Sequence, residues 1–166
     1  MRAVVIFESL WGNTEQLARA IAAGLGDGAQ VVDAMSAPAA LGPDVDLLVV
    51  GGPTHAFSLS TAATRASAQQ QGAPRIPERG IREWIEALSA PSRAVPVATF
   101  DTRVVSPRLP GSAAKKAMKR LVALGCRPVA RPESFGVHGS SGPVAEGELA
   151  RAERWGAALL AAVPGA

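Results

Sequence analysis

The chain has 166 residues, which fits one domain, residues 1–166, around one core. Its hydrophobic content of 48% is typical of a globular protein, and no segment has the composition of a disordered one. A single cysteine excludes an internal disulfide. Together with two histidines it cannot supply an ordinary zinc site, so we expect no metal.

The formal net charge is +3, from 17 basic and 14 acidic residues. A basic chain favours an acidic partner or a nucleic acid. We expect no nucleic-acid partner, because the basic residues are scattered and are not interleaved with aromatic ones. We expect no membrane contact, because no run is long enough to span a bilayer. An apolar run follows Met1 and Arg2 at once, so we expect no signal peptide and a cytoplasmic location.

Predicted strands and helices alternate along the chain. An unbroken β-branched run predicts a buried strand over residues 2–8, and apolar residues at helical spacing predict a helix over residues 14–25. Further strands are predicted at residues 30–33, 47–52 and 94–100 and, with a break at Pro132, within residues 127–137. Further helices are predicted at residues 81–88, after a cap at Ser112, and at residues 146–163, with Val122 and Leu149 among the inward-facing residues of the last two. This alternation favours a parallel sheet covered by helices on both faces.

Two long segments, residues 53–79 and 101–111, are predicted to be mostly irregular. The stretch Ala63–Pro77, rich in Ala, Gln and Pro, is the best candidate for a mobile flap. The Gly- and Ser-rich loop that starts at His138 is expected to connect to the last helix and to lie away from a ligand at the sheet edge.

The loop between the first strand and the first helix is rich in hydroxyl, amide and glycine residues. It consists of Ser9, Leu10, Trp11, Gly12, Asn13 and Thr14. Such a turn directs free backbone N–H groups to one point at a helix start that favours negative charge, so it can hold a phosphate group. The alternative is an ordinary loop in which Asn13 or Thr14 caps the helix. The loop lacks the motifs of the common dinucleotide and triphosphate sites.

Three of the seven aromatic residues lie in or at the start of the loops that follow the first, third and fourth strands: Trp11, Phe57 and Phe100. In a parallel sheet these loops emerge at the carboxyl edge, where ligands bind. Aromatic residues there indicate a flat apolar guest, and with a phosphate socket they indicate a phosphorylated planar ring. The alternative is that the aromatic side chains only cover the strand ends.

With these features together, the sequence resembles a flavodoxin over essentially its whole length. The first loop resembles the phosphate loop of that family, with Trp11 at a position that Thr usually holds. Residues 51–57 resemble the second flavin loop, and residues 100–103 stand where the third belongs. Residues 109–112 and 132–135 are similar to those of a small single-domain branch. The resemblance implies an α/β, flavodoxin-like three-layer sandwich, with a five-stranded parallel sheet of order 2-1-3-4-5 and helices on both faces.

The resemblance also implies one non-covalently bound FMN. Its phosphate would be held by Ser9, Leu10, Trp11, Gly12, Asn13 and Thr14. One side of the isoalloxazine ring would be flanked by Pro53, Thr54, His55, Ala56 and Phe57. The other side would be flanked by Phe100, Asp101, Thr102 and Arg103.

The chain departs from the family pattern in two respects. It has no Tyr to stack on the ring, and it is basic where flavodoxins are usually strongly acidic. If Arg103 lies near N1 of the ring, its charge would raise the flavin potential.

Three functions remain open. The first is an FMN electron carrier with no catalytic residue of its own, acting on a transient redox partner protein as a monomer or weak dimer. The second is an FMN-dependent NAD(P)H oxidoreductase that acts on a small substrate, with His55 as a candidate proton donor. The third is a binding module that keeps the fold but has lost the flavin, which the replacement at Trp11 favours. We favour the carrier over the reductase.

Overall fold

A parallel sheet forms the centre of the molecule. The computed structural model describes residues 1–163. The strands are β1 (Ala3–Phe7), β2 (Ala29–Asp33), β3 (Leu47–Pro53), β4 (Pro96–Val104), β5 (Arg127–Pro128) and β6 (Glu133–Val137). The helices are α1 (Asn13–Leu25), α2 (Ala62–Gln70), α3 (Ile81–Ala87), α4 (Ala113–Ala123) and α5 (Glu148–Ala162).

The strand order is β2-β1-β3-β4-β5, and β6 also pairs with β4. Every strand pair in the sheet is parallel. The predicted break at Pro132 is present, so β5 pairs with the start of β4 and β6 with its end. This arrangement confirms the predicted flavodoxin-like fold class.

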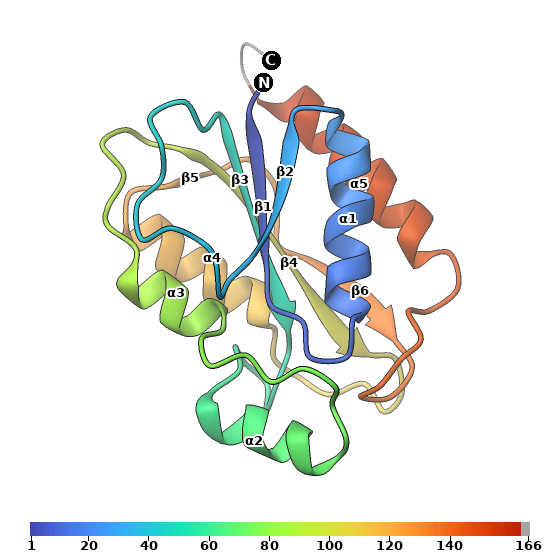
Figure 1. The fold of residues 1–166 in the computed structure, drawn as a ribbon. Coiled ribbons are helices and arrows are strands. Elements are labelled where there is room, and N and C mark those ends of the chain that lie inside the picture. The colour runs from blue at the N-terminus through green and yellow to red at the C-terminus, as the bar shows by residue number, and fades with distance from the viewer. Residues whose placement is uncertain (164–166) are drawn as a thin grey trace.

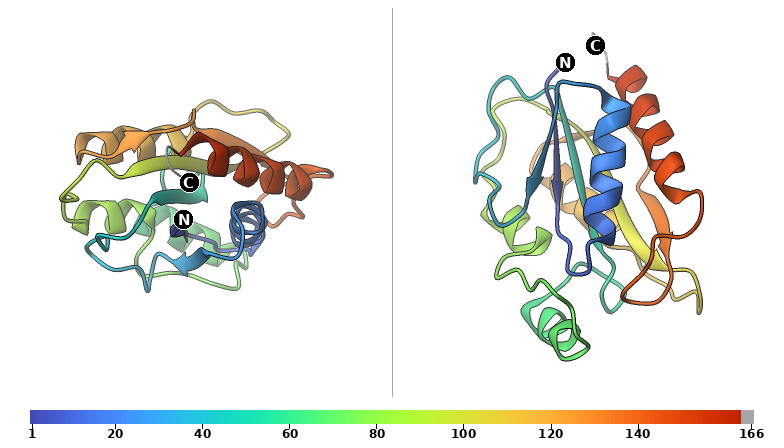
Figure 2. Two further views of the ribbon diagram at one scale, coloured as in Figure 1. Left: turned by 90° about the horizontal axis from the view of Figure 1, so that it is seen from above. Right: turned by 45° about the vertical axis from the view of Figure 1, so that its right-hand side comes forward.

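Helices cover both faces of the sheet (Figures 1 and 2). Side chains of α1 and α5 pack with one set of strand residues, and side chains of α3 and α4 pack with the other set. Because successive strand residues point to opposite faces, a strand buried on both sides must be apolar throughout. Both β1 and the first four residues of β3 meet this requirement. Within residues 1–163, no helix combines the length and hydropathy needed to cross a bilayer.

Helices α1 and α5 approach each other closely through two glycines. A Cβ atom added at Gly156 would overlap the carbonyl oxygen of Ile21 in α1. A Cβ atom added at Gly24 would likewise overlap the carbonyl oxygen of Glu153 in α5. The contact therefore requires glycine at both positions, and it brings the last helix of the chain against the first.

The structure corrects four local expectations. Residues 53–79 are not mostly irregular, because they contain α2. Strand β4 continues past Phe100 to Val104, because its last residues pair with β6, so residues 100–103 lie in a strand and not in a loop. Val122 and Leu149 do not face inward and are 43% and 41% exposed. Helix α4 instead buries an alanine-rich face with Met118 and Leu121.

The glycine contact gives a direct test of the α1–α5 packing. Gly156→Ala should lower the free energy of unfolding by about 1–3 kcal/mol, because the added methyl group forces two backbones apart. Urea unfolding measures the change. Ala158→Ser, at an exposed position of the same helix, should change it by less than about 0.5 kcal/mol. Equal small effects of the two substitutions would contradict the close approach.

Candidate functional site

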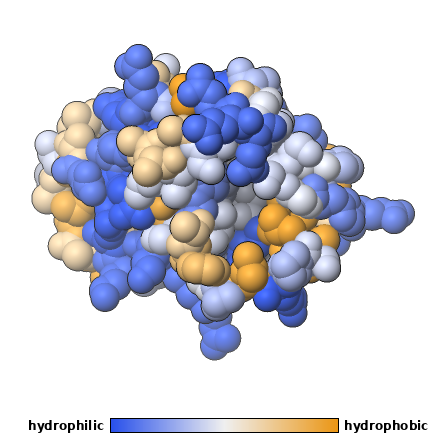
Figure 3. Space-filling view, turned by 90° about the horizontal axis from the view of Figure 1, so that it is seen from below, coloured by the Kyte–Doolittle hydropathy of each residue, from blue (hydrophilic) through white to orange (hydrophobic). Residues whose placement is uncertain are grey.

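A cavity of about 310 Å³ opens at the carboxyl edge of the sheet, beyond the ends of β1, β3 and β4. Figure 3 looks onto this edge and shows a hollow near the centre of the face. The cavity is lined by Ser9, Leu10, Trp11, Asn13, Thr14, Pro53, Thr54, His55, Ala56, Thr64, Ser67, Ala68, Gln71, Thr102, Val104, Val137, Gly139 and Ser140. Its volume lies at the lower end of the range for small-molecule sites, about 300–1,000 Å³.

One end of the cavity is the start of α1. The N-cap residue is Gly12, in a left-handed conformation with φ of 93°, and no side chain caps the helix. The Gly12 N–H donates to Ser9 Oγ (3.1 Å), and the Thr14 hydroxyl is hydrogen-bonded to that of Thr102 (3.0 Å). The predicted alternative, a cap by Asn13 or Thr14, is therefore not what the structure shows. Uncapped N–H groups at a helix start favour an anion.

The loop after β6 closes this end of the cavity. Gly139 and Ser140 line the cavity, and Gly142 packs so closely on Asn13 that a Cβ atom there would lie 2.7 Å from Asn13 Nδ2. Sequence reasoning placed the loop that starts at His138 away from a ligand, and the structure overturns this. Strand β6 ends at the same edge as β1, so the loop that follows it returns to the start of α1.

The predicted phenylalanines do not contribute to the apolar lining, which comes from Leu10, Trp11, Pro53, Ala56, Ala68, Val104 and Val137. Phe100 is 1% exposed and packs in the core against Phe135, with ring centroids 6.2 Å apart. It points to the α1–α5 side of the sheet because β4 continues through it.

Two further predicted residues, Asp101 and Arg103, also lie outside the cavity lining. Asp101 is buried, and its Oδ2 accepts hydrogen bonds from Ser112 Oγ (2.6 Å) and the Ala114 N–H (3.0 Å) at the start of α4. The Arg103 guanidinium donates to the carbonyl oxygen of Leu109 (2.5 Å) and lines a neighbouring hollow. Thr102 is the one residue of this predicted group that reaches the cavity.

The loop after β3 makes a tight turn at the mouth of the cavity. His55 and Ser58 exchange backbone hydrogen bonds of 2.8 and 3.0 Å. The two central residues, Ala56 and Phe57, have φ of 45° and 70°, a left-handed region that favours glycine. Phe57 is 52% exposed and does not line the cavity. Burial, and secondarily the charge of Arg65, lowers the pKa of His55, whose Nδ1 is 3.1 Å from Thr64 Oγ1.

Helix α2 forms a wall of the cavity that the sequence analysis missed. Figure 1 shows it beyond the carboxyl edge of the sheet, outside both helical layers. Thr64, Ser67 and Ala68 face the cavity. The signal that could have found the helix is the capping box at its start, in which the Thr61 hydroxyl accepts from the Thr64 N–H (3.2 Å).

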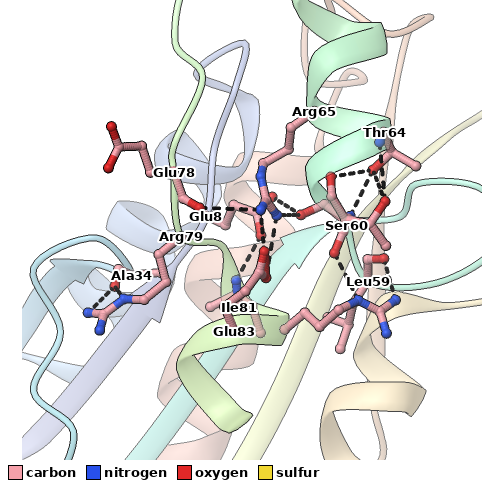
Figure 4. A network of polar contacts seen from close by, with 12 residues as sticks. Glu8, Ala34, Leu59, Ser60, Thr64, Arg65, Glu78, Arg79, Ile81 and Glu83 are labelled. Atoms are coloured by element: carbon pink, nitrogen blue, oxygen red, sulfur yellow. Dashed lines mark hydrogen bonds and ion pairs between the residues drawn. The ribbon is translucent and has the colours of Figure 1, made fainter. Parts of the chain in front are cut away.

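A buried polar cluster attaches α2 to the rest of the protein (Figure 4). Arg65 is 2% exposed and donates to Ser60 Oγ (2.8 Å), and it forms an ion pair with Glu83 of α3. Ser60 Oγ in turn donates to Glu8 Oε2 (2.5 Å), and the Ile81 N–H donates to Glu8 Oε1 (2.8 Å). Because Glu8 directly precedes Ser9, the cluster connects the cavity wall to the loop at the start of α1.

Burial raises the pKa of Glu8 above its ordinary value, although the hydrogen bonds from Ser60 and Ile81 and the charge of Arg65 oppose the shift. Glu8 is 1% exposed, and the charge of the nearby Glu83 also raises its pKa. One arginine therefore faces two acidic side chains.

Comparison with known proteins relates this fold to the flavodoxins. Residues 5–85 match the family model for flavodoxin, which includes the whole first loop and α2. A flavodoxin from the domain Archaea superposes with a TM-score of 0.67 and 17% identity, covering 98% of this chain and 99% of that one. Flavodoxin 1 from Bacillus cereus gives a TM-score of 0.66 and 18% identity, covering 95% of each chain.

The chain has the flavodoxin-like fold over its length, and residues 5–85 match the flavodoxin family model. The same fold is found within rubredoxin oxygen:oxidoreductase from Desulfovibrio gigas, with a TM-score of 0.63 and 18% identity, covering 99% of this chain and 37% of that one. Identities this low show the fold alone. No curated protein sequence gives a match. Proteins of the flavodoxin family hold a flavin cofactor, typically FMN.

The buried carboxyl group of Glu8 predicts a pH-dependent stability. A raised pKa means that the folded protein keeps the Glu8 proton where the unfolded chain has released it. Its contribution is complete below the ordinary pKa of 4.5 and is lost as the pH rises through the folded value. Glu8→Gln stays neutral, so its free energy of unfolding relative to the unaltered protein should increase as the pH rises.

Urea unfolding between about pH 5 and pH 8 measures this difference. Glu146→Gln, at an exposed position, is the matched control and should show no such increase. A Glu8→Gln difference that stays constant across this range would contradict a raised pKa at Glu8.

Proposed function

We propose that this protein is a flavodoxin that binds one FMN non-covalently in the cavity and transfers electrons through it. The observation that supports the proposal most is the uncapped start of α1 at one end of a cavity with an apolar wall. A helix start attracts a phosphate group, and an apolar wall attracts a flat ring. FMN has both parts in one molecule.

The residues present fit this cofactor. Ser9, Asn13 and Thr14, with the N–H groups of the first turn of α1, would hold the phosphate. Trp11 and the Pro53–Ala56 segment would flank the ring, together with the missed residues of α2 and the loop after β6. The third predicted flavin loop contributes Thr102 and, beyond the predicted residues, Val104.

Bound FMN would supply the chemistry, because a flavin accepts and releases electrons one or two at a time. The chain's own residues bind, orient and shield it. Helix α2 covers the cavity on one side and limits access of water. The potential of the flavin would depend on the polar groups that this wall presents to the ring.

A specific observation favours a carrier over the reductase considered from the sequence. The pKa of His55 is lowered, mainly by burial, so the imidazole is neutral at neutral pH. A neutral imidazole hydrogen-bonded to Thr64 serves better as a fixed hydrogen-bonding group than as a proton donor. The binding module without flavin is also less favoured, because Trp11 lines an open cavity and does not fill it.

The proposal predicts that the purified or FMN-reconstituted protein is yellow and holds one FMN per chain. Titration of FMN into the FMN-free protein should quench the flavin fluorescence and saturate at that ratio. An absence of quenching by both FMN and riboflavin would contradict flavin binding. Oxidation of NAD(P)H by the loaded protein alone would favour the reductase.

The assignment of the phosphate end predicts a selective effect of Thr14→Ala. A hydrogen bond to a charged group contributes about 1.5–3 kcal/mol, so FMN affinity should fall by roughly 10- to 150-fold. Riboflavin lacks the phosphate and should lose far less affinity. Equal losses for both ligands would place the phosphate elsewhere.

A further inference from the structure

An exposed apolar surface adjoins the cavity, which we call the docking rim: Phe57, Val105 and Leu109, with Arg103 and Arg108 beside them. The three apolar side chains are 52%, 40% and 54% exposed. Phe57 and Leu109 line a hollow of about 140 Å³, and this hollow shares Thr54, Ala56 and Val104 with the cavity. Figure 3 shows apolar side chains, in orange, on this face beside the central hollow.

Close backbone contacts hold the two loops of the rim in place. The turn that exposes Phe57 has positive φ at Ala56 and Phe57, neither of which is glycine. This backbone conformation costs free energy, and residues that adopt it cluster at functional sites. Gly111 packs against the backbone of Phe57 so closely that a Cβ atom would overlap it. The Arg103 guanidinium holds the carbonyl group of Leu109 (2.5 Å). The two loops that form the rim are therefore fixed against each other.

The charged residues of the two rim loops, Arg103 and Arg108, are both basic. Residues 47–77 contain no Asp or Glu, and residues 102–132 contain eight basic residues and none that is acidic. Two acidic side chains, Glu146 and Glu148, line a neighbouring hollow together with Arg103, Arg108 and Arg151. Arg151 pairs with Glu148 at 2.8 Å and reduces its field. An approaching surface therefore meets an apolar centre with arginine beside it.

We infer that the docking rim binds the acidic face of an electron-transfer protein, which contributes an apolar side chain to the hollow between Phe57 and Leu109 and carboxylates to Arg103 and Arg108. The inference rests on the proposed function. With FMN bound, the complex would pass one electron at a time from the partner's reduced centre, which would be oxidised, to the flavin, which would be reduced. An apolar centre surrounded by charge is typical of protein interfaces, and opposite charge speeds their encounter.

A protein explains the rim better than a nucleic acid or a lipid surface. Nucleic-acid sites that stack bases present rows of aromatic residues along a basic groove, and the rim has one aromatic side chain. A lipid surface requires an amphipathic element or a cluster of lysines, and the rim consists of short loops with two arginines. A small contact of this kind suits a transient complex, which buries less than about 1,200 Å².

The test measures binding directly and needs no flavin. Oxidised plant-type [2Fe–2S] ferredoxin, an acidic redox protein, is titrated into the FMN-free protein by calorimetry, and basic cytochrome c serves as the comparison. Ferredoxin should bind at low ionic strength and lose affinity as salt is added, because screening acts over about 8–10 Å at ordinary ionic strength. Cytochrome c should not bind.

Two pairs of matched variants locate the contact. Arg108→Glu and Leu109→Ser should each weaken ferredoxin binding by at least about tenfold. Arg127→Glu makes the same charge change in β5 at the opposite edge of the sheet, and Val122→Ser makes a similar change at an exposed position of α4. Both controls should bind ferredoxin within about twofold of the unaltered protein.

Three outcomes would overturn the inference: no ferredoxin binding, equal losses in the rim and control variants, or equally tight binding of a DNA duplex or of phosphatidylserine vesicles. Failure of the proposed function is recognised separately, because it shows as a lack of FMN binding by a protein that still binds ferredoxin at the rim.

Discussion

The N–H groups in the first turn of α1 set the main constraint on this edge of the molecule. A helix start must satisfy these groups, and here no side chain does so. Gly12 makes the required left-handed turn, and Ser9 accepts its N–H group. The carboxyl ends of β1, β3 and β4 and the loop after β6 gather around this point. A bound phosphate would accept hydrogen bonds from the N–H groups at the start of α1 that no side chain caps.

The buried cluster around Arg65 determines the shape of the opposite wall. Helix α2 buries only Arg65 and Ala68, so apolar packing contributes little to its position. A buried arginine that faces Glu83, Ser60 and, through Ser60, Glu8 holds it instead. Such a cluster is costly to form and costly to break, and it favours a single arrangement of the groups involved. The wall of the cavity is thereby coupled to the residue that precedes the first loop.

The sequence predicted the elements whose cause is local or periodic. The β-branched run of β1, the repeat of α1 and the cap at Ser112 all have direct counterparts in the structure. Helix α2 was not predicted from the sequence, because it buries an arginine and not an apolar stripe. The fourth strand was predicted to end at Phe100, because its continuation to Val104 depends on pairing with β3 and β6. Gly139 and Ser140 were missed because their position depends on where a distant strand ends.

The central claim concerns the contact between the start of α1 and a phosphate group, and backbone amide NMR tests it most directly. FMN and riboflavin are added in turn to the isotopically labelled protein. The account predicts that FMN shifts the amide signals of Asn13, Thr14 and Glu15, and that riboflavin leaves them nearly unchanged while it shifts the Trp11 indole signal. Equal shifts of the three amide signals with both ligands, or none with FMN, would contradict it.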